Sequence, residues 1–294
     1  MAVFSNRRPF GSTPQCCSVV MCALYTMTPV AAEGAGSSPP SPVWIQWYGP
    51  DGYGNGEGCY RPENNQITAS GLVQTVNVRT TDCGGKSLPY ATAQMSWQSF
   101  SFTYGVVEYQ AKFAGGRGTW PAIWLLGTQC QPYGSGPNCH WPKRGANEID
   151  LTEIKINLKR QDSQPYQVPF QNAFSQQNGS VLSCTPQISD TTQNYHDYKF
   201  VWSQTALLWF VDGTLTCSTA SPQFIPTTPM FVLIDLYLGK NDGGGPIDRT
   251  TFPQSNTIRY LRICPVGTNV CDAAHATIFD DEFQPGVPAK YAHK

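Results

Sequence analysis

The chain is interrupted throughout by glycine and proline, and the segments between them have the two-residue alternation typical of β-strands. Its 294 residues include 27 Gly and 24 Pro. Residues 196–202 alternate aromatic with mainly polar side chains, and residues 207–211 end at Asp212-Gly213, a typical hairpin turn. We find no long segment with a helical period. Many short strands joined by turns predict an all-β sandwich.

Further strands are expected where apolar residues cluster between turns. These segments are 72–78, 104–113, 123–126, 230–238 and 257–263. The segment 230–238 is almost continuously apolar, which indicates a strand buried on both faces. With 40% apolar and only 13% charged residues, the chain is suited to one large β domain. We place this single domain at residues 43–285, followed by a tail at 286–294.

The N-terminal residues 1–32 have the features of a secretory signal. Arg7 and Arg8 precede a mostly apolar stretch, and Val30-Ala31-Ala32 offers small residues for cleavage. A lipoprotein anchor at Cys22 is the alternative, although Met21 stands where a small residue is expected. Residues 33–42 read as a flexible spacer. No 20-residue apolar run follows residue 32, so we expect a secreted, extracellular protein without a membrane segment.

Eleven cysteines are present, of which Cys16, Cys17 and Cys22 lie in the predicted signal. The even number that remains favours disulfides in an exported chain, and no Cys–His grouping has zinc-site spacing. Spacing alone does not fix the pairing. Short loops favour Cys130–Cys139 and Cys264–Cys271, and we expect Cys59–Cys83 and Cys184–Cys217 for the remainder.

The charge of the chain gives little support for a nucleic-acid partner. Removing residues 1–32 takes away two arginines and no acid, which changes the formal net charge from −1 to −3. Nucleic-acid binding needs a basic stripe, and the sequence has none. We therefore expect no nucleic acid as a partner, and a monomer.

Three acids, Glu148, Asp150 and Glu153, lie within six residues of an expected strand. Alternation places Glu148 and Asp150 on one face, whereas the odd offset of Glu153 would place it on the other. One bulged residue at Leu151 or Thr152 would bring all three to the same face. Three clustered acids repel each other, so a fold gains no stability from this arrangement. The alternative is a solvated edge strand.

Retaining glycoside hydrolysis is the chemistry that uses such an array. One carboxylate attacks the anomeric carbon, and a protonated second carboxyl about 5–5.5 Å away protonates the leaving oxygen. A third acid between them can hydrogen-bond the nucleophile and help to keep the acid protonated. The strand would then have to line a concave surface.

The motifs that surround these acids resemble glycoside hydrolase family 16. The resemblance runs in order through 104–112, 118–126, the bulged catalytic motif Glu148/Asp150/Glu153 of laminarinases, 197–213 and 257–263. It implies a β-jelly-roll of two curved antiparallel sheets with a concave substrate cleft. It also implies a retaining endo-β-glucanase that acts on β-1,3- or mixed β-1,3/1,4-glucan. Glu148 would be the nucleophile, Asp150 its helper and Glu153 the acid/base.

The same resemblance implies a set of substrate-binding residues. They are Trp120, Trp124, Asn55, Glu108, Asp235, Tyr237 and, because the family's His pair is missing from 169–174, Gln171 or Asn172. Each of three residues also has a purely structural interpretation: Trp124 could pack in the core, Asn55 could belong to an ordinary turn, and Glu108 could accept a structural hydrogen bond. No cofactor is implied; a structural calcium occurs in relatives, but the sequence identifies no ligands for it.

The sequence also departs from the family. Gln110 stands where Arg is common, and the insertion 129–144, with Cys130, Cys139 and Trp141, is expected to form a stapled loop over one end of the cleft. The motif Phe279-Asp280-Asp281-Glu282-Phe283 lies near the C-terminus, whereas the family has a similar motif in its first strand. We predict that this tail pairs beside 43–47 or the last strand and replaces that first strand.

Three alternative functions remain open at this point. A transglycosylase would use the same acids but exclude water. An algal-galactan hydrolase would use the basic residues near the catalytic strand to bind sulfated sugars; these are Lys143, Arg144, Lys155, Lys159 and Arg160. A non-catalytic β-glucan-binding protein would share the fold but have no need of all three acids.

Overall fold

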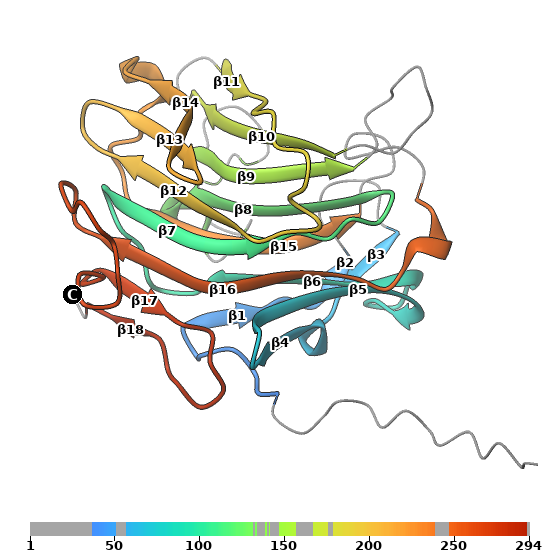
Figure 1. The fold of residues 1–294 in the computed structure, drawn as a ribbon. Coiled ribbons are helices and arrows are strands. Elements are labelled where there is room, and N and C mark those ends of the chain that lie inside the picture. Colours follow the sequence, from blue (N-terminus) through green and yellow to red (C-terminus); the bar gives the residue numbers. More distant parts are fainter. Residues whose placement is uncertain are drawn as a thin grey trace, which may run out of the picture. The chain divides into compact units, whose positions relative to one another are not determined.

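Two curved and mainly antiparallel sheets form the body of the protein (Figure 1). In this computed structural model the described residues are 37–50, 57–131, 133, 139, 141, 147–156, 167–175, 179–238 and 247–292. The predicted signal 1–32 and Asn55 lie outside them. The expected all-β jelly-roll is confirmed. Among the described residues, no helix has the length and apolar character needed to span a membrane.

Sheet A contains most of the strands that were predicted from alternating apolar and polar residues. Its order is β14 (Thr214–Thr219), β13 (Leu207–Val211), β12 (His196–Trp202), β7 (Gly105–Lys112) and β16 (Gln254–Cys264). The free side of β16 pairs with β5 (Gly71–Asp82) in its first half and with β17 (Phe279–Asp281) in its second half. β4 (Asn65–Thr68) and β18 (Lys290–Tyr291) extend β5 and β17. The expected hairpin between β13 and β14 turns at Asp212 and Gly213, both with positive φ.

Sheet B carries the segment with the three acids. Its order is β11 (Val181–Cys184), β10 (Gln167–Phe174), β9 (Glu148–Ile156), β8 (Thr119–Gly127), β15 (Met230–Leu238), β6 (Ser87–Trp97) and β1 (Trp44–Gln46). The β5–β6 hairpin joins the two sheets. β2 (Gly49–Pro50) pairs with β3 (Gly58–Tyr60), which pairs in parallel with β6, so the sheets are not wholly antiparallel.

The core lies between the sheets and is rich in aromatic residues. Trp97, Trp202 and Trp209 are fully buried. Polar contacts also cross the core: the Tyr109 hydroxyl of β7 lies 2.8 Å from Thr152 Oγ1 of β9. The indole N–H of Trp209 donates to the backbone oxygen of Asp150 at 3.1 Å. The inner side of β9 is therefore fixed to sheet A, which leaves its other side to carry the acids.

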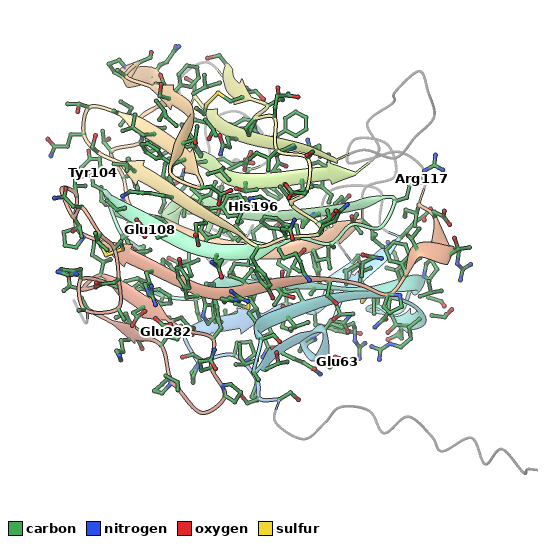
Figure 2. The ribbon with its side chains drawn as sticks, in the orientation of Figure 1. Glu63, Tyr104, Glu108, Arg117, His196 and Glu282 are labelled. Atoms are coloured by element: carbon green, nitrogen blue, oxygen red, sulfur yellow. A yellow bond between two sulfur atoms is a disulfide. The ribbon has the colours of Figure 1, made fainter. Side chains whose placement is uncertain are left out.

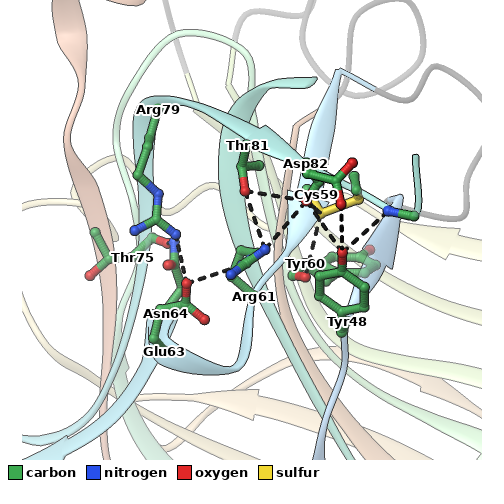
Figure 3. Close-up of polar contacts among 12 residues, drawn as sticks. Tyr48, Cys59, Tyr60, Arg61, Glu63, Asn64, Thr75, Arg79, Thr81 and Asp82 are labelled. Carbon is green, nitrogen blue, oxygen red and sulfur yellow. Dashed lines mark hydrogen bonds and ion pairs between the residues drawn. A yellow bond between two sulfur atoms is a disulfide. The ribbon is translucent and has the colours of Figure 1, made fainter. Parts of the chain in front are cut away.

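In the described part of the chain, four 3-10 helices connect strands. They are η1 (Pro62–Asn64), η2 (Thr128–Cys130), η3 (Pro222–Phe224) and η4 (Arg249–Thr251). Around η1, Glu63 accepts from Arg61 at 3.0 Å and from Arg79 at 2.7 Å, as Figure 3 shows. These bonds hold the segment after β3 against β5. They support the neighbouring residue Tyr60, which reaches the pocket described below.

All four expected disulfides are present. They are Cys59–Cys83, Cys130–Cys139, Cys184–Cys217 and Cys264–Cys271. The Cys184–Cys217 bond joins β11 of sheet B to β14 of sheet A, and so fastens the edges of the two sheets to each other. The Cys130–Cys139 bond closes the insertion that precedes β9. Both bonds therefore constrain the part of the sandwich next to the acids.

The two ends of the domain are more ordered than the sequence indicated. Within the predicted spacer 33–42, Ser38 pairs with Ile67 and Pro40 is buried. In the predicted tail 286–294, Lys290 and Tyr291 form β18. The motif 279–283 pairs beside the last strand β16, as one of the two predicted arrangements had it (Figure 1). Its Phe279 and Phe283 are buried in the core.

Candidate active site

A bulge in β9 brings the three acids to the same side of the sheet. On β8, Ile123 pairs with Thr152 and Trp124 pairs with Asp150, so Leu151 has no partner in this register. This is the one-residue bulge that the sequence predicted, and it restores the parity of Glu153. Glu148, Asp150 and Glu153 accordingly line one pocket on the face of sheet B that points away from the core.

Glu148 lies beneath an indole from the insertion. The Trp141 N–H donates to Glu148 Oε2 at 2.8 Å. Burial and, secondly, the charge of Glu153 raise the pKa of Glu148 to about 8, although the Trp141 hydrogen bond and the charge of Lys155 act in the opposite direction. The sequence identified Trp141 only as part of a stapled loop and did not predict this contact.

Glu153 accepts two N–H bonds, one at each oxygen. The indole of Trp120 donates to Oε1 at 2.7 Å, and the amide of Asn172 donates to Oε2 at 2.6 Å. The Lys155 ammonium lies 3.9 Å from Oε1 and 4.1 Å from the centre of the Trp120 ring. Glu153 is therefore held in position by β8, β9 and β10 together.

Asp150 is the most deeply enclosed of the three acids, with 3% of its surface exposed. The Asn172 amide donates to its Oδ2 at 2.7 Å. Burial raises the pKa of Asp150 well above its ordinary range, and the charges of Glu153 and Glu148 add to this effect. Because three carboxyls share a small, poorly hydrated space with one ammonium, the cluster retains a proton at neutral pH.

Aromatic side chains form the walls around the acids. Trp120 and Trp124 of β8 both line the pocket, as do Asp235 and Tyr237 of β15. The Trp124 indole donates to Asp235 Oδ2 at 2.9 Å, and Trp120 meets Tyr237 edge-on with ring centres 5.3 Å apart. The structure thus brings these four predicted residues together with the acids.

The insertion contributes to the same walls. The Tyr133 and Trp141 rings contact Trp124, with ring centres 5.9 and 5.6 Å apart, and both line the pocket. The described part of the insertion, closed by Cys130–Cys139, therefore covers the Glu148 side of the site. This agrees with the predicted stapled loop.

Two of the residues proposed from the sequence to bind substrate lie away from this pocket. Glu108 is on β7 of sheet A, where it pairs with Lys199 at 3.2 Å (Figure 2). Gln110, on the same side of β7, contacts Asp197 and Arg259, so its difference from the family does not alter the pocket. Gln171 is buried and accepts from Thr216 at 2.8 Å, whereas its neighbour Asn172 lines the pocket. Asn55 lies outside the described residues.

Within the described part of the chain, no group of three or more His, Cys, Asp or Glu is arranged to hold a metal ion. The pocket instead offers carboxyl groups that differ in hydrogen bonding, next to flat apolar rings. The carboxyls can attack, donate or accept protons, and the rings can stack on the C–H faces of sugars. This combination on a jelly-roll suits the chemistry of glycoside hydrolysis.

The comparisons with known proteins place the chain in a family. Residues 61–260 match the family described as "Glycosyl hydrolases family 16", and the chain belongs to that family. It is 30% identical over 179 residues to a keratan-sulfate endo-1,4-beta-galactosidase of Sphingobacterium multivorum, a match that covers 59% of this chain and 40% of that protein. It is 28% identical over 237 residues to a beta-glucanase of Rhodothermus marinus, covering 75% of this chain and 78% of that protein.

A solved structure shares the fold. A LamA variant of Zobellia galactanivorans, crystallised with laminaritriose and laminaritetraose, superposes with a TM-score of 0.64 and 24% identity. The superposition covers 77% of this chain and 96% of that chain. The fold of this chain is thus shared with a protein that was crystallised with these two oligosaccharides.

Proposed function

We propose that this chain is a secreted, retaining endo-β-glucanase that hydrolyses β-1,3- or mixed-linkage β-1,3/1,4-glucan. Glu148 attacks the anomeric carbon and forms a glycosyl-enzyme ester. Glu153 gives its proton to the leaving oxygen, and then takes a proton from the water that cleaves the ester. Asp150 is the helper: it lies between the two acids on β9 and binds the same Asn172 amide as Glu153.

The observation that carries the proposal is the Leu151 bulge. Without it, Glu153 would point into the core, and the pair of carboxyls that a double displacement requires would not face one substrate. The three acids repel one another and lose hydration in the pocket, which raises the pKa of Glu148 and of Asp150. This arrangement lowers the stability of the fold, so stability does not explain why the acids are clustered, whereas a catalytic role does.

The charge of the pocket favours a neutral glucan over a sulfated galactan. The described lining residues include four acids, Glu148, Asp150, Glu153 and Asp235, and one base, Lys155. Lys155 is already engaged by Glu153. A net negative pocket repels sulfate groups, whereas uncharged sugars lose nothing by entering it. The other basic residues that kept the galactan alternative open lie outside the described residues.

Export is supported by the four disulfides. Disulfides persist in oxidising compartments and are rare in the cytosol. Together with the signal predicted at residues 1–32, they favour an extracellular enzyme. A non-catalytic glucan-binding protein is disfavoured because this site has all three acids in place.

The test is activity on a panel of laminarin, lichenan, agarose and carrageenan with wild type, Glu148→Gln and Glu153→Gln. We expect reducing ends from laminarin or lichenan with wild type, and at least about a hundredfold loss in either variant with sugar binding retained. Wild-type activity in Glu148→Gln would contradict the assignment. Redistribution of chain length without new reducing ends would instead identify a transglycosylase.

A further inference from the structure

The amide of Asn172 contacts two acids at once. Its nitrogen donates to Asp150 Oδ2 at 2.7 Å and to Glu153 Oε2 at 2.6 Å. We infer that Asn172 is a positioning residue that holds the Glu153 carboxyl in the orientation in which it gives its proton to the leaving group. This inference rests on the proposed function, because it assigns Glu153 as the acid.

The orientation of the amide is fixed from its other end. Ser183 of β11 lies opposite Asn172 in the sheet, and its hydroxyl donates to Asn172 Oδ1 at 2.6 Å. Asn172 is 5% exposed, so water does not compete for these bonds. A flipped amide would turn its oxygen toward two carboxylate oxygens and lose both N–H bonds. The NH2 group therefore faces the acids.

The register of the sheet places Asn172 for this role. Asn172 pairs directly with Asp150, and the β9 bulge shifts the register so that Glu153 pairs with Phe170. The bulge therefore brings Asp150 and Glu153 to the same amide. Without it, Glu153 would lie on the other face, and Asn172 would contact only Asp150.

The chemical consequence follows from the donor-only character of an NH2 group. Its two hydrogens bind one oxygen of each acid, so a single side chain fixes Asp150 Oδ2 and Glu153 Oε2 relative to each other. The Trp120 indole binds the other oxygen of Glu153, Oε1. The Glu153 carboxyl is thus held from both sides in one orientation, which general acid catalysis requires.

An amide differs from an imidazole in one useful respect. Histidine in this place would change its charge near neutral pH and so alter its bonds to the acids. Asn172 stays neutral at every pH, so the alignment of Glu153 does not depend on a second titration. Segment 169–174 lacks the family's His pair, and Asn172 orients the acids in its place.

The experiment compares two substrates in Asn172→Ala and Ser183→Ala. One substrate is a β-1,3-glucan oligosaccharide, whose leaving group needs a proton. The other is the dinitrophenyl glycoside of a short β-1,3-glucan, whose leaving group needs none. The measured quantity is kcat/KM, which reports the first chemical step, with thermal unfolding as a check that each variant is folded.

We expect Asn172→Ala to lower kcat/KM on the oligosaccharide by roughly tenfold to a hundredfold, part of the 10²–10⁴ that general acid catalysis contributes. On the dinitrophenyl glycoside the loss should be under about threefold. Ser183→Ala, which keeps the amide but frees its orientation, should show the same contrast at smaller size. Ser183→Ala also provides the test on its own if the Asn172→Ala variant does not fold.

Equal losses on the two substrates, or no loss on either, would overturn the inference. Glu153→Gln separates this failure from failure of the proposed function. If Glu153→Gln is inactive on the oligosaccharide and active on the dinitrophenyl glycoside, Glu153 is the acid, and only the role of Asn172 is in question. If Glu153→Gln is fully active on the oligosaccharide, the proposed function itself fails.

Discussion

The buried carboxyl of Asp281 makes the C-terminal strand sensitive to pH. Asp281 is 3% exposed; it accepts the Trp44 indole N–H and the Phe283 backbone N–H, each at 2.9 Å. Burial raises its pKa from 3.8 to about 6, although both hydrogen bonds lower it. An acid whose folded pKa is raised stabilises the fold below its unfolded pKa, and this stability is lost as pH rises through the folded pKa.

The magnitude follows from the shift. A rise of about two pKa units corresponds to about 3 kcal/mol at about 1.4 kcal/mol per unit. Because Asn does not titrate, the stability of wild type minus that of Asp281→Asn should fall by about 2.4 kcal/mol between pH 4 and pH 7, since part of the roughly 3 kcal/mol is already lost at pH 4. The comparison removes the contribution of other titrating groups, which the two proteins share.

The assay is urea unfolding with intact disulfides at pH 4, 5, 6 and 7, analysed by linear extrapolation. Asp248→Asn is a suitable control, because hydrogen bonds from Thr250 lower the pKa of Asp248 and its contribution has the opposite sign. A wild-type-minus-variant difference that stays constant across this range, or that rises with pH, would refute the assignment of Asp281 as a buried acid with a raised pKa.

Three further predictions concern the site and the core. Glu148 must be ionised to attack the anomeric carbon, and its pKa is raised to about 8, so kcat/KM should rise as pH increases toward about 8; a profile that is flat from pH 5 to pH 8 would contradict this. Trp141→Phe removes an N–H bond that favours ionised Glu148 and should move that limb to higher pH; an unchanged profile would exclude this role. Phe279→Ala removes a buried ring 4.6 Å from Trp97 and should cost about 3–5 kcal/mol in urea unfolding, whereas a loose tail would show no change.

The alternation of the sequence predicted many strands of the sandwich closely. The segments 196–202, 207–211 and 230–238 appear as β12, β13 and β15 with the same bounds. The bulge was predictable because the odd offset of Glu153 conflicts with the even offset of Asp150, and one extra residue resolves the conflict. Local periodicity was therefore sufficient to predict both the positions of these strands and the alignment of the acids on one face.

The sequence was less informative where local periodicity does not determine the position of a residue. Alternation shows that Glu108 points away from the core, but not that β7 belongs to the sheet opposite the pocket. Gln171 and Asn172 are adjacent, and which of them faces the acids depends on the register with β9. The place of Trp141 over Glu148 depends on a loop closed by Cys130–Cys139. Each of these facts depends on pairing between distant segments.

The stereochemistry of the first product tests the central claim most directly. Glu148 as nucleophile and Glu153 as acid/base give two inversions at the anomeric carbon, so the sugar is released in its original configuration. A proton NMR time course of laminarin hydrolysis should show the β-anomer first, followed by slow mutarotation. Initial appearance of the α-anomer would show a single displacement by water and would contradict the account.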